Sequence, residues 1–130
     1  MDKVVHFEIP ADDLERAQKF YKKAFDWMIN PIPQMNYTIL GTTAVDEMNM
    51  PKEPGAINGG MMQRSDLIKC PVITISVENM DEALKIVESS GGKIAEGKME
   101  VPNMGITAYF KDTEGNVLGL LASNKKTLTP

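Results

Sequence analysis

Only a few side chains in this sequence could take part in acid–base or metal chemistry. His6 is the only histidine among the 130 residues, and Glu8 follows it two positions later. In an extended segment, residues two apart project from the same face, so the imidazole and the carboxylate would lie side by side. Such a pair could orient the imidazole for proton transfer, with His6 or Glu8 as the catalytic base, or it could be a solvated ion pair.

Other reactive residue types have simpler interpretations. The 10 methionines are interpreted mainly as core side chains, although flexible thioethers could also line an adaptable pocket. Asp112 and Glu114 precede Gly115, a composition typical of a tight turn between strands. Thr74 and Ser76 have no basic neighbour in the sequence, so a nucleophilic hydroxyl is not favoured.

The composition is that of a single globular domain. A chain of 130 residues is long enough for one core, and a net charge of -4 argues against nucleic acid as a partner. Cys70 is the only cysteine, so an intrachain disulfide is excluded and a reducing, cytoplasmic location is expected. We find no secretory signal pattern and no apolar stretch long enough to cross a membrane.

The chain contains a weak internal repeat with an offset of 66 residues. At this offset Phe7 aligns with Ile73, and Ile9 aligns with Ile75. In each copy, alternating apolar residues predict a strand, and apolar residues spaced by three and four then predict a helix. Asp12 or Asp13 could cap the N-terminus of the first helix. Asn79 or Asp81 could cap the second helix, and Gly91 with Gly92 would end it.

After each helix the pattern changes to strands. The second copy is therefore predicted to be β-α-β-β-β, and the first copy is similar but less regular. Residues 48–55 contain two prolines and are interpreted as a mobile loop. The predicted strands are 37–41, 57–63, 93–96, 106–111 and 116–122.

Several segments together resemble the vicinal-oxygen-chelate superfamily of glyoxalases, bleomycin-resistance proteins and dioxygenases. They are the segment Val5–Tyr21, the later Trp27, Gly91 with Gly92, and Phe110–Asn116. The resemblance covers nearly the whole chain. It implies an α+β domain of two βαβββ units, roughly residues 1–66 and 70–124, forming a curved mixed sheet with helices on its convex side.

The resemblance also implies where a metal would bind. Enzymes of this superfamily hold a divalent ion with His and Glu ligands from the first and last strands of each unit. His6 matches the first position, but Val72 and Gly119 match two others, and the fourth is Asn58, Gly59 or Gly60 depending on the alignment. A catalytic zinc site generally needs about three protein ligands. We therefore predict no metal or other cofactor, and we interpret His6 as a hydrogen-bonded group.

The function that we predict is metal-independent binding of a small molecule in the concave face of the sheet. The alternatives are a glyoxalase-like lyase or isomerase and a protein-interaction module; fold analogy alone does not choose between them. The superfamily resemblance further implies a homodimer in which the partner chain completes each cavity. Besides His6 and Glu8, the residues expected to line the cavity are Trp27, Tyr37, Val72, Thr74, Thr107, Tyr109 and Gly119.

Overall fold

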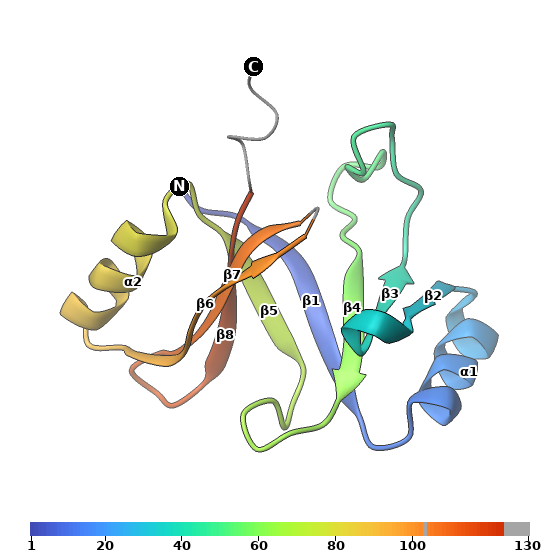
Figure 1. Cartoon of the computed structure of the whole chain (residues 1–130). Helices are drawn as coiled ribbons and strands as arrows, with labels where there is room; N and C mark the ends of the chain where they lie inside the picture. The colour runs from blue at the N-terminus through green and yellow to red at the C-terminus, as the bar shows by residue number, and fades with distance from the viewer. Residues whose placement is uncertain (103, 124–130) are drawn as a thin grey trace. The chain divides into compact units, whose positions relative to one another are not determined.

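The computed structural model describes residues 1–102 and 104–123, and the chain forms two compact units (Figure 1). The N-terminal unit contains His6–Pro71, and the C-terminal unit combines Met1–Val5 with the chain from Val72 onward. Within the described residues, each unit contains one α-helix and a four-stranded mixed sheet in the order β-α-β-β-β. The predicted α+β class is therefore confirmed. Among the described residues, no helix is long and apolar enough to span a bilayer.

The sheet of the N-terminal unit has the strand order β2-β3-β4-β1. β1 and β4 are parallel, whereas β2 with β3 and β3 with β4 are antiparallel. The parallel pair brings the first and last strands of the unit side by side. The elements are β1 (Val4–Ala11), α1 (Leu14–Phe25), β2 (Met28–Ile32), a short 3-10 helix η1 (Pro33–Met35), β3 (Tyr37–Gly41) and β4 (Gly59–Gln63).

Helix α1 covers one face of this sheet, and its ends follow from the local sequence. The Asp13 side chain accepts a hydrogen bond from the backbone N–H of Arg16, and Asp26 ends the helix in the left-handed conformation with φ of 60°. Leu40 and Met61 are fully buried beneath the helix. Burying side chains of this size stabilises the unit by about 1.5–3 kcal/mol each.

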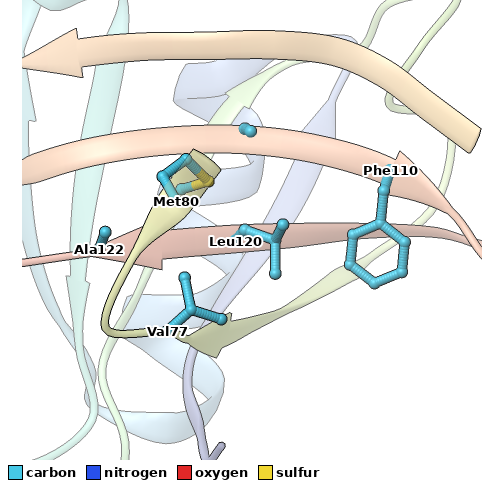
Figure 2. Packing of buried hydrophobic residues seen from close by; sticks show 6 residues of the cluster. Val77, Met80, Phe110, Leu120 and Ala122 are labelled. Carbon is cyan, nitrogen blue, oxygen red and sulfur yellow. The ribbon is translucent and has the colours of Figure 1, made fainter. Parts of the chain in front are cut away.

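The C-terminal unit repeats this plan with the strand order β5-β8-β7-β6. Val77, Met80 and Leu120 belong to its buried core, where α2 meets the sheet (Figure 2). Asn79 caps α2 by accepting a hydrogen bond from the backbone N–H of Glu82. The elements are β5 (Val72–Ser76), α2 (Met80–Ser89), β6 (Lys93–Val101), β7 (Gly105–Lys111) and β8 (Val117–Ala122).

The acidic segment between β7 and β8 forms the predicted turn. Asp112 Oδ1 accepts hydrogen bonds from the backbone N–H groups of Glu114 and Asn116, and Gly115 adopts a φ of 84°. The hydrogen bonds from Asn116, side chain first, hold the pKa of Asp112 below its ordinary value. Asp112 is thus engaged in shaping the hairpin.

Three differences from the sequence prediction concern the less regular segments. β2 was not predicted, because Met28–Ile32 lacks apolar alternation and contains Pro31. β6 extends to Val101, beyond the predicted end at 96, and its pairing with β7 shifts register twice. At the start of the segment predicted as a mobile loop, the backbone N–H groups of Met48 and Met50 donate to Oδ1 of the preceding Asp46 and so form a local turn.

Candidate functional site

A chain of three polar side chains lies on the face of the N-terminal sheet opposite α1. His6 and Glu8 project from this face of β1, because Phe7, Ile9 and Ala11 pack on the helix side. The Nε2 atom of His6 lies 2.8 Å from the hydroxyl oxygen of Tyr37, and that hydroxyl donates to Oε2 of Glu8 at 2.8 Å. The parity prediction for His6 and Glu8 is confirmed, and Tyr37 joins them.

Tyr37 reaches this position because a glycine lies beneath its ring. Gly60 in β4 pairs with Glu8 of β1 on one side and with Ile39 of β3 on the other. A Cβ atom added to Gly60 would overlap the phenol of Tyr37. The phenol therefore occupies the space that a side chain at position 60 would need.

The direction of the hydrogen bonds determines the state of the histidine. A tyrosine hydroxyl has one proton, and here it is donated to Glu8, so its oxygen must accept from Nε2–H of His6. Burial lowers the pKa of His6 from its ordinary value of 6.5, and the nearby Glu8 charge opposes this effect more weakly. At neutral pH the ring is therefore uncharged, with its lone pair on Nδ1.

The residues of this site do not fit the metal centre that the superfamily resemblance implies. Thr74 pairs with Gly119 in the C-terminal unit as Glu8 pairs with Gly60, so the two glycines are equivalent. Gly60 is thus the position that the sequence alignment had left open. Within the described residues, no three His, Cys, Asp or Glu side chains gather as potential metal ligands.

Two further observations concern the positions at which a metal-ligating side chain was expected. A Cβ atom at Gly119 would lie 2.7 Å from Oγ1 of Thr74, just as one at Gly60 would overlap Tyr37. Asn58, the remaining alternative in the first unit, uses its Oδ1 atom to accept the backbone N–H groups of Thr42 and Thr43. Hydroxyl groups fill the spaces beside both glycines.

The other predicted cavity residues of the C-terminal unit share one face of their own sheet. Ala108, Phe110 and Leu120 face α2, so their alternating neighbours lie on the opposite face. Val72 and Thr74 are buried there. The predicted cavity residues of this unit are Val72, Thr74, Thr107, Tyr109 and Gly119. That they bind a ligand stays a prediction.

The prediction that Trp27 lines the same cavity as Tyr37 is wrong. The Trp27 ring stacks on Tyr21 of α1 with centroids 4.9 Å apart, and it lies 5.7 Å from the ring of Phe7. It therefore belongs to the apolar cluster on the helix side of the sheet. The cause is its place between α1 and the unpredicted strand β2, where its side chain turns to the same side as Ile29.

A shallow groove of about 380 Å³ lies at the start of α1, on the other side of the sheet from the polar chain. Arg16, Phe20 and Arg64 are among its lining residues. The Arg64 guanidinium is already engaged, since its Nε donates to Asp12 at 2.9 Å and its Nη1 donates to the carbonyl of Lys69. We assign no ligand to this groove.

Comparisons with known proteins agree with this fold. Residues 3–43 match the family model described as bleomycin resistance protein-like N-terminal. A glyoxylase-like domain-containing protein of Didymella fabae is 30% identical over 114 residues, which is 84% of each chain.

Solved structures with the same fold are more distant in sequence. Methylmalonyl-CoA epimerase from Mycobacterium tuberculosis has a TM-score of 0.64 at 16% identity, over 96% of this chain and 90% of that one. A glyoxalase/bleomycin resistance protein/dioxygenase superfamily member from Vibrio splendidus has a TM-score of 0.59 at 11% identity, over 95% and 99%. At these identities the likeness concerns the fold alone.

Proposed function

This chain belongs to the glyoxalase/bleomycin resistance protein/dioxygenase superfamily, and we propose that it is a metal-independent member that binds a small molecule. The observation that carries the proposal is the hydrogen-bonded chain of His6, Tyr37 and Glu8. Small-molecule sites typically combine apolar walls with a few fixed polar groups, and this face has that composition. We further propose that the protein works in the cytoplasm, in keeping with its single cysteine.

Absence of a bound metal is tested by elemental analysis of tag-free protein after dialysis. We expect no zinc, nickel or iron near one equivalent per chain, because glycines replace donor side chains at positions 60 and 119. One tightly retained metal ion per chain, lost in a His6→Gln variant, would contradict the proposal.

Binding is tested by NMR, because the single histidine gives an unambiguous ring signal. A library of small neutral, cationic and anionic fragments is added to protein labelled with ¹⁵N in the imidazole ring. We expect at least one fragment to shift the His6 ring signals, and the Tyr37→Phe variant to weaken that binding. Tyr21→Phe is the matched control, since it loses a hydroxyl on the helix side. A library that leaves His6 unchanged would rule out binding at this site.

A second candidate function is acid–base catalysis by a lyase or isomerase. The neutral His6 ring is coupled through Tyr37 to the Glu8 carboxylate, an arrangement that could accept a proton and stabilise the resulting charge. Methylmalonyl-CoA, the substrate named for two of the structurally similar epimerases, is a suitable probe. Incubation in D₂O would report removal of its acidic C–H proton as deuterium incorporation.

The two functions predict different outcomes in that experiment. Simple binding predicts no deuterium incorporation above the protein-free rate, because a protein that only binds the probe does not remove its C–H proton. Incorporation that is lost in His6→Gln, while Tyr21→Phe retains it, would favour the enzyme.

A further inference from the structure

The accessible nitrogen of the His6 ring is a hydrogen-bond acceptor. The Nε2–H group donates to the hydroxyl oxygen of Tyr37, so the nitrogen left for a ligand is Nδ1. In the part of the chain that the structure describes, no side chain or backbone group hydrogen-bonds to Nδ1. Every fully buried side-chain polar atom there has a hydrogen-bond partner, so Nδ1, which has none, is not fully buried. Nδ1 is therefore open to an incoming group, and that group must be a donor.

The charge around the ring leads to the same conclusion. Glu8 is 7% exposed, and its carboxylate is linked to the ring through a single hydroxyl group. The four strands of the N-terminal unit contain no lysine or arginine. An anion at Nδ1 would meet an acceptor lone pair close to a carboxylate, whereas a cationic or neutral donor would meet favourable charge.

The side chains of β3 and β4 beside the polar chain are apolar, and Asn30 of β2, which pairs with Ile39, is a further polar residue on this face. Ile39 of β3 and Met62 of β4 have the same strand parity as Tyr37 and Gly60, and both are half-buried. Such side chains can pack on a hydrocarbon or aromatic group but offer no counter-charge. The charge on this face therefore comes from the three-residue chain, since Asn30 is neutral.

Building on the proposed binding function, we infer that the ligand is an apolar molecule carrying a hydrogen-bond donor, either an amine or an alcohol. Its N–H or O–H donates to Nδ1 of His6, while its apolar part packs beside Ile39 and Met62. Carboxylates and other anions are rejected at this position. This class differs from the acyl-CoA substrates named for the epimerases of similar fold.

The first test is the tautomer of His6 in the free protein. Long-range ¹H–¹⁵N correlation spectra of ring-labelled protein at pH 7.5 distinguish a protonated Nε2 from a protonated Nδ1. We expect the proton on Nε2 in the parent protein and a loss of this preference in Tyr37→Phe. A free protein with its proton on Nδ1 would overturn the inference, because Nδ1 would then be a donor.

The second test compares three probes of similar shape: benzylamine, benzyl alcohol and benzoate. We expect the His6 ring signals to shift with benzylamine and benzyl alcohol, and benzoate to bind most weakly. Glu8→Gln should lower the affinity ratio of benzylamine to benzyl alcohol about fivefold, the difference between a charge-assisted and a neutral interaction. Glu15→Gln on α1 makes the same charge change away from the site and should leave the ratio unchanged.

The outcomes separate the inference from the proposed function. If benzoate binds most tightly, the site still binds small molecules but the ligand class is wrong. If none of the three probes shifts the His6 signals, the inferred ligand class is wrong. If no fragment of the library shifts these signals either, the proposed binding function is wrong as well.

Discussion

At the scale of single residues, the site depends on a phenol hydroxyl that donates one hydrogen bond and accepts another. Tyr37 donates to a carboxylate and accepts from an imidazole, so it fixes the proton positions of both neighbours. A carboxylate buried like that of Glu8 needs such donors, because loss of hydration is otherwise costly. A phenylalanine would fill the same volume but would remove the connection between His6 and Glu8.

We predict that Tyr37→Phe destabilises the protein by about 1–3 kcal/mol, the usual cost of removing one partner from a buried polar group. Urea unfolding followed by circular dichroism measures this change. Tyr21→Phe is the control, because its ring packs against Trp27 and none of the described residues hydrogen-bonds to its hydroxyl. Equal stability losses in the two variants would show that the hydroxyl of Tyr37 has no special role.

The lowered pKa of His6 predicts a pH dependence of stability. Because burial lowers the folded-state pKa below 6.5, the unfolded chain binds a proton more readily as the pH falls below that value. The free energy of unfolding should therefore decrease from about pH 6.5 downward until the folded-state pKa is reached, and it should not depend on this group above that window.

NMR titration of the single histidine and urea unfolding at several pH values check this prediction together. His6→Gln should lose the slope between about pH 6.5 and 5.5, where carboxylates contribute less because their ordinary pKa values are near 4. A titration midpoint at or above 6.5 in the folded protein would contradict it.

At the scale of secondary-structure elements, β4 provides the space that the polar chain occupies. Its Gly60 lies between β1 and β3, so its lack of a side chain lets the ring of Tyr37 pass over the strand. A backbone position thus controls the geometry of three side chains on neighbouring strands. The equivalent Gly119 in β8 leaves space for Thr74 in the same way.

We predict that Gly60→Ala displaces Tyr37 and destabilises the protein by about 1–3 kcal/mol, as overpacking of a filled site usually does. The measurement is urea unfolding combined with the His6 ring spectrum, which should lose its fixed tautomer. Gly97→Ala in β6 is the matched control, because an added Cβ there meets nothing within 4 Å. An unchanged His6 spectrum in Gly60→Ala would show that Tyr37 does not depend on this glycine.

Elements whose pattern is local were predictable from the sequence. The alternation in β1, the caps of α1 and α2, and the Asp112 turn all depend on residues a few positions apart. The His6 and Glu8 face followed from strand parity in the same way. β2 was missed because Pro31 interrupts its pattern, and the mistaken role of Trp27 followed from that omission.

The connection through Tyr37 depends on non-local pairing. Its sequence separation from His6 is 31 residues, and the contact requires the registers of β1, β3 and β4 to be known together. A strand pattern indicates which face a residue occupies but not which residue of another strand lies beside it. Tyr37 was therefore predicted at the site, but its role as a bridge was not.

At the scale of the whole molecule, both units differ in the same way from the metal-binding pattern that the superfamily resemblance implies. Gly60 and Gly119 are equivalent, and a hydroxyl group fills the space beside each. Glycine at both positions, together with Val72 aligned with His6 in the sequence repeat, is the basis of the proposed metal-independent function.

The expectation of a homodimer concerns the surface of the whole chain. The edge strands β2 and β6 give little reason to pair, because β2 contains Pro31 and β6 has two register shifts. A stronger physical reason is the exposed aromatic surface of α1, where Phe20 and Phe25 are 58% and 59% exposed and their ring centroids lie 6.2 Å apart.

We predict that light scattering at micromolar concentration gives a mass near twice 14.4 kDa. Replacing both Phe20 and Phe25 by serine should shift the protein toward the monomer if α1 forms the contact, because the apolar area available for burial is reduced. Ile86→Ser in α2 removes a side chain that is 63% exposed and serves as the control. A mass near 14.4 kDa for the unmodified protein at every concentration would rule out the dimer, and a dimer that persists in the double variant would place its contact away from α1.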